Sequence, residues 1–294
     1  MKKLNLKKAV PYLFVSPYML FFVLFGLVPL VMCVVISFTK WDYVAPMEWY
    51  GVENFKLIFG AVGSGKISRD FWNSVLHTLL FVAVQTPLLI IIPLLLAMLI
   101  ARCKAVRKFS MGFFYFPTLL SITTVCILWN FMLDTNAGII NHILGKDIPW
   151  ITQMPYAWIS IFLLSTWWGV GGNMLLYVAA IVNVPQELIE AAKIDGAGAF
   201  KRFFSVILPS IRTTLVYTVI TTTIGSFNML GQAQVLTAGG PNYGTRTVMM
   251  MIYDTAFGGK NNFGRACAMS LVFGAIMLGF TVAAYKLQTR NMED

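Results

Sequence analysis

The sequence predicts an all-α integral membrane protein with six transmembrane helices. Hydrophobic residues make up 58% of its 294 residues and charged residues only 12%, and the mean hydropathy is +0.74. A soluble chain of this size carries about twice that charged fraction. The apolar runs are also continuous, without the alternation of lipid-facing strands, which argues against a membrane β-barrel.

Six apolar runs are long enough to cross a bilayer, whose core needs about 20 apolar residues in a helix. Five of these runs contain no Asp, Glu, Lys or Arg, and the other contains only Arg212, near its start. A long side chain at that place can extend to the membrane surface. The predicted spans cover residues 12–38, 74–101, 110–131, 156–181, 207–229 and 266–285.

The first span has the basic flank of a signal peptide, with four lysines among residues 1–8. Its apolar run is too long for a cleavable signal, so it is expected to be retained as the first helix. No internal repeat or low-complexity tract interrupts the chain, and the six spans are expected to form one compact body plus the N-terminal helix.

The charges favour an orientation with both termini in the cytoplasm. The inner segments then hold 14 basic and five acidic residues, whereas the outer segments hold eight basic and seven acidic residues. Nearly all of the net charge of +10 therefore lies on one side, as the positive-inside bias requires. The short loop 102–109, with four basic residues and no acid, contributes most to this assignment. A charge distributed in this way indicates membrane orientation and not nucleic-acid binding.

Three patterns that resemble catalytic or ligand sites are better explained by structure. GAVGSGK at 60–66 has the spacing of a phosphate-binding loop, but Ile67 replaces the Ser or Thr that would hold magnesium. His77 and His142 are isolated, and the four cysteines form no CxxC pair. No carboxylate pair lies in the spans. We expect no catalytic residue, metal site or cofactor, which argues against an intramembrane enzyme and against an ion-coupled carrier.

The charged segment ELIEAAKIDGAGAFKRFFSVILPSI, residues 187–211, lies between two apolar runs. Pro185 fits the first turn of a helix of about ten residues, and Gly196 can adopt a positive φ after it. A second amphipathic piece follows, with Phe200, Phe203 and Phe204 on its apolar side. The predicted helix–turn–helix is either an interfacial pair resting on lipid headgroups or a docking element for a cytosolic partner.

One motif in this segment resembles a known family. Glu190-Ala191-Ala192, three residues, Gly196, nine residues and Val206-Ile207-Leu208-Pro209 match the EAA loop of ABC importer permeases, EAA-x3-G-x9-I-x-LP, with Val206 as the one departure. The continuation AAKIDGAGAFKRFFSVILP and the later LTAGGPNYGTRT are similar to the carbohydrate branch. With PTLLSITTVCILW and STWWGVGGNMLLY, the likeness covers about residues 10–290 and is greatest to sugar permeases of the MalF/UgpA type.

The resemblance implies a type I (MetI-like) importer permease fold and a set of partners. These are a second six-span permease, two cytosolic ATPase subunits that hydrolyse the ATP, and an extracytoplasmic sugar-binding protein. The implied domains are 1–73 (tail, first helix and outer loop), 74–286 (permease core, with the EAA loop at 183–209) and 287–294 (cytoplasmic tail). The residues expected to contact the ATPase are Glu190, Ala191, Ala192, Asp195 and Gly196.

A sugar path needs groups that hydrogen-bond to hydroxyls together with an aromatic face. By position in the matched motifs, and for Asn228 by residue type, the expected path residues are Thr118, Ile122, Ser165, Trp168, Gly169, Gly172, Ser226, Asn228 and Met229. Ser121 and Asn173 are further candidates by residue type. The alternative is that the Ser, Thr and Gly residues only allow close helix packing.

The sequence therefore predicts a non-enzymatic sugar-import subunit in a bacterial cell membrane. Within the same importer class, a cargo such as glycerol phosphate is the alternative, although Arg212 is the only basic residue in the spans and lies near the cytoplasmic end. A stand-alone secondary carrier is a third possibility, but it would leave the EAA loop unexplained.

Overall fold

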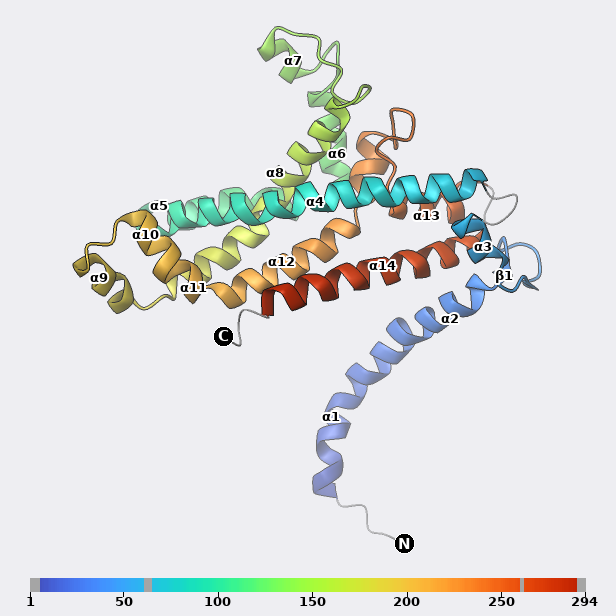
Figure 1. Ribbon diagram of the computed structural model, residues 1–294, viewed down its shortest axis with the longest axis horizontal. Coiled ribbons are helices and arrows are strands. Elements are labelled where there is room, and N and C mark those ends of the chain that lie inside the picture. The colour runs from blue at the N-terminus through green and yellow to red at the C-terminus, as the bar shows by residue number, and fades with distance from the viewer. Residues whose placement is uncertain (1–5, 61–64, 260–261, 290–294) are drawn as a thin grey trace. The chain divides into compact units, whose positions relative to one another are not determined.

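The computed structural model describes residues 6–60, 65–259 and 262–289 (Figure 1), and almost all of its regular structure is helical. The elements in chain order are α1 Leu6–Phe22, the π-helix η1 Val23–Leu27, α2 Val28–Ser37, β1 Thr39–Lys40, β2 Glu48–Trp49, α3 Glu53–Phe59, α4 Gly65–Arg102, α5 Lys104–Tyr115, the 3-10 helix η2 Phe116–Leu119, α6 Ile122–Met132, α7 Ile139–Leu144, α8 Tyr156–Val182, α9 Gln186–Ile194, α10 Ala199–Arg202, the π-helix η3 Phe203–Ile207, α11 Leu208–Ser210, α12 Arg212–Phe227, the π-helix η4 Gln232–Leu236, α13 Val248–Phe257 and α14 Phe263–Thr289.

The chain forms two compact units. Unit 1 contains Met1–Phe71 and Ile252–Ala275, and unit 2 contains Trp72–Met251 and Ile276–Asp294. These units are defined by packing, so the functional division expected at residues 73 and 286 stays a prediction.

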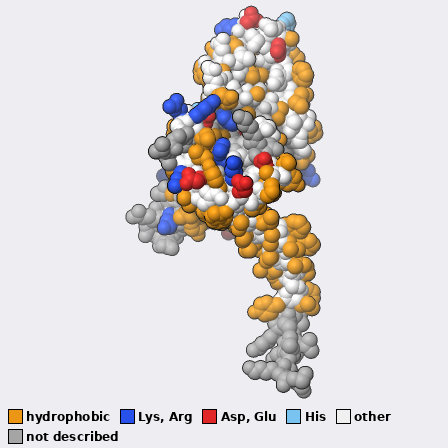
Figure 2. Space-filling view, turned by 90° about the vertical axis from the view of Figure 1, so that its right-hand side faces the viewer, with side chains coloured by type: hydrophobic (Ala, Val, Ile, Leu, Met, Phe, Trp, Pro, Cys, Tyr) orange, Lys and Arg blue, Asp and Glu red, His pale blue; other side chains and the backbone are white. Residues whose placement is uncertain are grey.

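Unit 1 begins with an apolar helix that runs through α1, η1 and α2. Its stretch Tyr12–Ser37, whose most apolar 18 residues have a mean hydropathy of 3.0, forms a column of hydrophobic side chains without a charged residue in Figure 2. The antiparallel pair β1–β2 follows, with Thr39 opposite Trp49. The buried Asn54 side chain donates to the carbonyls of Ser37 and Thr39, at 2.9 and 2.8 Å, and so holds the end of the helix against the first strand.

Within the described residues, four continuous helices are long and apolar enough to cross a membrane. They are Tyr12–Ser37, Gly65–Ala101, Tyr156–Val182 and Phe263–Lys286. Each contains 24 or more residues, which exceeds the roughly 20 that a bilayer core requires. These helices confirm four of the six predicted spans. The second begins about nine residues before the predicted start at 74, because polar residues extend the helix beyond its apolar part.

The other two predicted spans, 110–131 and 207–229, are not straight helices. Ala105–Leu119 and Ile122–Met132 meet at 95°, and Ala199–Ser210 and Arg212–Phe227 meet at 74°. Six spans are reached when each bent pair counts as one. At the first bend Ser121 is extended, and its hydroxyl accepts from the backbone N–H of Thr124 at 3.2 Å, which starts a new helix.

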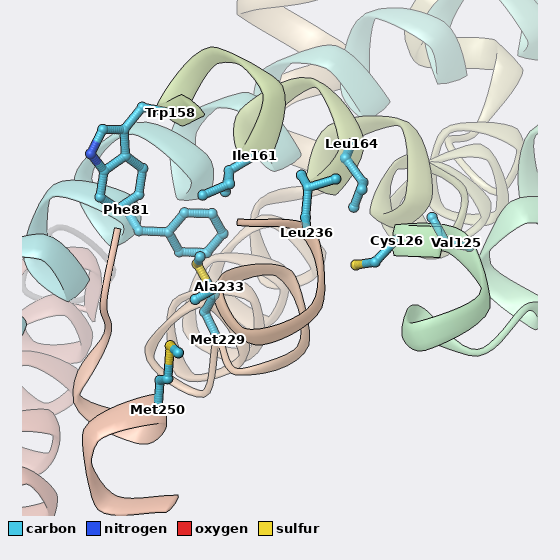
Figure 3. Close-up of a cluster of buried hydrophobic side chains, with 10 residues drawn as sticks. All are labelled: Phe81, Val125, Cys126, Trp158, Ile161, Leu164, Met229, Ala233, Leu236 and Met250. Atoms are coloured by element: carbon cyan, nitrogen blue, oxygen red, sulfur yellow. The ribbon is translucent and has the colours of Figure 1, made fainter. Parts of the chain in front are cut away.

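Unit 2 packs around α8, whose first residues lie near α6 and whose last residues lie near α9 (Figure 1). One buried cluster joins α4 and α8 to the start of α12 through Ile100, Tyr177, Ile181 and Ile211. A second cluster joins α4, α6 and α8 to the 229–236 segment. In Figure 3 the Phe81 ring points into this cluster. The second cluster borders the cavity described next, because Phe81 and Met229 belong to both.

Candidate functional site

A cavity of about 620 Å³ lies inside unit 2. Its walls come from α4, α6, α8, α12 and the segment from Asn228 to Val235. None of the described residues that line it is charged. The lining consists of Phe81, Gln85, Leu89, Ile122, Thr123, Ser165, Trp168, Gly169, Gly172, Asn173, Thr222, Gly225, Ser226, Asn228, Met229, Leu230, Gly231, Gln232, Gln234 and Val235.

Eight of the nine residues predicted for the path line this one cavity. They are Ile122, Ser165, Trp168, Gly169, Gly172, Ser226, Asn228 and Met229. Thr118 is not among the lining residues, and its hydroxyl donates to the Trp168 carbonyl at 2.8 Å. Of the two further candidates, Asn173 lines the cavity, whereas Ser121 caps α6. The structure thus brings together residues that lie more than 100 positions apart, and their part in transport stays a prediction.

Trp168 links the cavity wall to the break between η2 and α6. Its indole N–H donates to the Leu120 carbonyl at 3.1 Å. Leu120 has extended dihedral angles, so its carbonyl lies outside a regular helix and needs a partner from elsewhere. Because the indole nitrogen supplies this hydrogen bond, the rest of the large ring system is left to form part of the cavity wall.

Asn173 ties together three helices that surround the cavity. Its side-chain amide donates to the Leu89 carbonyl in α4 at 2.7 Å and to the Thr222 hydroxyl in α12 at 2.8 Å. Pro93 lies four residues after Leu89 and has no N–H, so the Leu89 carbonyl lacks its usual helical donor. Asn173 supplies that hydrogen bond from α8.

The glycines of α8 have different surroundings. A Cβ atom on Gly171 would overlap the backbone of Phe114 and Tyr115 in α5, so a glycine here permits close approach of the two helices. A Cβ on Gly169 would press against the Leu89 side chain at 3.2 Å. A Cβ on Gly172 would meet nothing within 4 Å, and this glycine lines the cavity. Its missing side chain therefore leaves open space.

Several polar residues of the cavity were missed by reasoning from the sequence. They are Gln85, Thr123, Thr222, Gln232 and Gln234. Gln85 could have been found from the sequence, because it is the only residue with an amide side chain in the apolar run 74–101. The two other glutamines belong to η4, in a segment expected to be an outer loop, and only the fold brings this segment to the cavity.

The predicted charged segment forms the expected helix and turn. Pro185 directly precedes α9 as its N-cap residue, one position outside the first turn where it was expected. Gly196 has a φ of +74° after the helix end. The Ala197 N–H donates to the Ala192 carbonyl at 2.9 Å and the Gly196 N–H to the Lys193 carbonyl at 3.0 Å. This pair of hydrogen bonds is the Schellman motif, in which glycine is strongly favoured.

The outer surface of this coupling segment, residues 183–209, is open. Glu190, Ala191, Asp195 and Gly196 are exposed, and Ala192 is partly buried. Exposed apolar side chains lie among them: Leu188, Ile194, Phe200 and Phe204. A smaller cavity of about 480 Å³ borders the segment and is lined in part by Arg107, Lys193 and Arg202.

The segment is firmly attached to the helices that carry it. Ile189, Val206 and Ile207 pack against the buried cluster that contains Ile181 and Val184 at the end of α8. The Arg202 guanidinium donates to the Ala197 carbonyl at 2.6 Å, which fixes the turn after Gly196. A force applied to α9 would therefore be transmitted to α8 and α4.

The remaining sequence patterns form no site in the described part of the chain. Residues 61–64 of GAVGSGK lie outside the described residues. His77 Nδ1 lies 3.2 Å from the Arg246 carbonyl, and His142 belongs to α7. No group of three or more His, Cys, Asp or Glu side chains that could hold a metal ion occurs in the searched, described residues.

Comparison with known proteins gives one family and many relatives. The family model "Binding-protein-dependent transport system inner membrane component" matches residues 57–291. The chain is 29% identical over 286 residues to the "Probable starch degradation products transport system permease protein AmyD" of Thermoanaerobacterium thermosulfurigenes, covering 96% of this chain and 95% of the relative. It is 26% identical over 287 residues to the sn-glycerol-3-phosphate transport system permease protein UgpA of Pectobacterium atrosepticum, with 96% and 95% covered.

Solved structures share the fold. A chain of a bacterial ABC transporter involved in the import of the acidic polysaccharide alginate has a TM-score of 0.80 and 21% identity, covering 97% of both chains. A chain of the MetNI methionine ABC transporter has a TM-score of 0.54 and 16% identity, covering 77% of this chain and 98% of that chain. These likenesses confirm the predicted type I importer permease fold.

Proposed function

The chain belongs to the family of binding-protein-dependent transport system inner membrane components, and we propose that it is the permease subunit of an ATP-driven importer for a neutral sugar of oligosaccharide size. The observation that carries the proposal is the uncharged cavity of about 620 Å³, which combines amide and hydroxyl side chains with Trp168 and Phe81. Its volume lies within the range of about 300–1,000 Å³ that is common for small-molecule sites.

The chemistry of the lining suits a sugar. Sugar hydroxyls exchange hydrogen bonds with amides and hydroxyl groups, and the C–H faces of a sugar ring pack on aromatic rings. Relatives named as permeases for starch degradation products, lactose, arabinooligosaccharides and diacetylchitobiose support a sugar cargo. A phosphorylated cargo, as in the name of UgpA, would favour a cationic lining because phosphate is recognised by Arg and Lys.

Energy for transport would come from two partner ATPase subunits that dock on the coupling segment. Glu190, Ala191, Ala192, Asp195 and Gly196 form the proposed contact, together with the exposed apolar side chains around them. Apolar groups of this size at an aqueous surface are typical of a protein interface. Closure of the ATPases would move α9 as a rigid lever and bias the helices between inward-open and outward-open states.

Two further partners complete the proposed machine. A second six-span permease would form the other half of the path, and an extracytoplasmic binding protein would deliver the sugar. Both termini and the coupling segment would face the cytoplasm of the bacterial cell. Two observations support this orientation: the basic loop 102–109 and the basic residues of the coupling segment.

Co-purification from the native membrane tests this proposal, with tagged chain extracted in mild detergent and its partners identified by mass spectrometry. An ATPase, a second six-span permease and a solute-binding protein are expected together. The purified complex is then supplied with ATP and with maltotriose, lactose, arabinotriose, diacetylchitobiose or glycerol 3-phosphate in turn, and ATP hydrolysis is measured. Stimulation by a neutral sugar supports the proposal, whereas stimulation by glycerol 3-phosphate alone contradicts the neutral cargo. A chain that purifies alone and moves solute without ATP would indicate a secondary carrier.

A further inference from the structure

Two buried oxygen atoms in the cavity wall lack a hydrogen-bond partner among the described residues. They are Gln85 Oε1 and Ser165 Oγ. The Gln85 side chain is 1% exposed and the Ser165 side chain 3% exposed, and both residues line the same cavity. Buried polar atoms are nearly always paired in folded proteins, by protein groups, water or a ligand, so two such atoms in one cavity wall mark a place where a molecule in the cavity is hydrogen-bonded.

The Gln85 amide is held in a defined orientation. Its Nε2 donates to the Thr166 hydroxyl in α8 at 3.2 Å. With the nitrogen engaged in this way, Oε1 is left as a pure hydrogen-bond acceptor. Gln85 on α4 and Ser165 on α8 both line the cavity, so the two unpaired oxygens belong to its wall. The Ser165 hydroxyl can both donate and accept.

An aromatic ring accompanies each polar group. Phe81 precedes Gln85 by four residues on α4, and Trp168 follows Ser165 by three residues on α8, spacings that place each pair on one helix face. All four residues line the cavity. Each helix therefore offers an oxygen next to an apolar ring surface, which matches the hydroxyl edge and the C–H face of a sugar ring.

We propose that Gln85 and Ser165 form a hydroxyl-reading pair that sets the cargo specificity of this permease: Gln85 Oε1 accepts a hydrogen bond from one sugar hydroxyl, and Ser165 Oγ exchanges one with the same sugar ring. This inference rests on the proposed function and assigns its cavity a selective group. Gln85 Oε1 needs a proton donor, which a carboxylate or a phosphate dianion does not offer. A deoxy sugar would likewise leave the oxygen buried and unpaired, and sites built on such pairing discriminate strongly against analogues that lack the hydroxyl.

The test uses the purified complex in proteoliposomes with its binding protein and the sugar from the panel above that stimulates ATP hydrolysis most. Uptake of this sugar is compared with uptake of its monodeoxy analogues and of its uronic acid derivative. The variants are Gln85→Leu and Ser165→Ala. Ser160→Ala is the matched control, because Ser160 lies on the same helix, is equally buried and already donates to the Trp150 carbonyl at 2.9 Å.

The wild-type complex is expected to take up the parent sugar at least about tenfold faster than one of the deoxy analogues, a ratio that Ser160→Ala keeps. Gln85→Leu and Ser165→Ala are expected to bring that ratio close to one. A variant that slows all sugars equally and keeps the wild-type ratio would show that the residue only supports packing, and would overturn the proposal. If no sugar of the panel is taken up by the wild-type complex, the proposed function fails instead, so the two failures are distinct.

Discussion

At the scale of single residues, some residues around the cavity support the fold and others shape the space inside it. Asn173 and Trp168 supply hydrogen bonds to the carbonyls of Leu89 and Leu120, which lack a helical donor because of Pro93 and because of the extended backbone at Leu120. Gly171 permits two helices to touch, whereas Gly172 leaves space. The polar side chains of a membrane helix thus serve the backbone as well as the ligand, and substitutions can tell these duties apart.

The neighbouring glycines of α8 provide one such test. Gly171→Ala is expected to destabilise the permease by about 1–3 kcal/mol, since its new methyl group would overlap the α5 backbone. Gly172→Ala should leave stability unchanged and reduce sugar uptake, since its methyl group enters the cavity. Thermal unfolding in detergent and uptake in proteoliposomes measure the two effects. Equal melting temperatures for both variants would contradict this division.

Two asparagines that line the cavity provide a second test of which polar residues support the fold and which contact the cargo. Asn173→Ala removes the donor to the Leu89 carbonyl and is expected to cost about 1–3 kcal/mol of stability. Asn228→Ala should leave stability unchanged, because among the described residues the Asn228 amide donates to the Ile224 carbonyl of its own helix, at 2.9 Å, and to no other helix. It should instead slow sugar uptake, as should Trp168→Ala. Full uptake by both cavity variants would remove these residues from the proposed path.

At the scale of elements, the sequence was more informative about helix positions than about helix shape. Continuous apolar runs located four membrane-spanning helices, and two bent helix pairs lie where the other two spans were expected. The EAA spacing located the turn at Gly196. The bends at residues 120–121 and 211 were missed. No glycine or proline stands at these positions, and the first bend is held by a distant partner, the Trp168 indole. Such a bend depends on tertiary contacts that hydropathy does not encode.

Some residues of the candidate site could likewise be predicted from the sequence, and others could not. Seven of the eight path residues that came from matching motifs to a family line one cavity, together with Asn228, which was chosen by residue type. Gln85 and the η4 glutamines were missed because their importance depends on what they face after folding. Motif matching also suggested Thr118, which does not line the cavity and whose hydroxyl donates to the Trp168 carbonyl of α8.

The turn after α9 carries the prediction that belongs to this scale. Gly196→Pro cannot adopt the φ of +74° or donate to the Lys193 carbonyl, so the Schellman turn should be lost. We expect membrane insertion to be retained and sugar-stimulated ATP hydrolysis to be abolished. Gly198→Ala is the control, because Gly198 has a φ of −63° and free space for a Cβ atom. Stimulated ATP hydrolysis at the wild-type rate in Gly196→Pro would contradict the proposal that α9 transmits the ATPase movement as a rigid lever.

At the scale of the whole molecule, the account requires the basic loop and the coupling segment to face the cytoplasm. Cys103 lies in that loop and is the exposed one of the four cysteines. A membrane-impermeant maleimide should therefore label inside-out vesicles strongly and intact spheroplasts weakly. Cys103→Ser should abolish the label in both preparations. Strong labelling of intact spheroplasts that disappears in Cys103→Ser would invert the proposed orientation.

Family membership and fold agree at this scale, since the matched region covers residues 57–291 and the alginate importer chain superposes over 97% of the protein. The described residues that line its cavity carry no charge, and the proposed neutral cargo follows from the chemistry of that lining. Moving a neutral solute against its gradient through such a cavity requires energy from outside the chain, and the coupling segment is the proposed point of entry for it.

The measurement that tests this central claim most directly is sugar uptake by proteoliposomes that contain the purified complex. ATP is enclosed on the side of the coupling segment, and binding protein with one panel sugar is added on the other side. The account predicts accumulation of a neutral sugar that stops when ATP is replaced by a non-hydrolysable analogue. Equal uptake without ATP, or uptake of glycerol 3-phosphate in place of every neutral sugar, would contradict it.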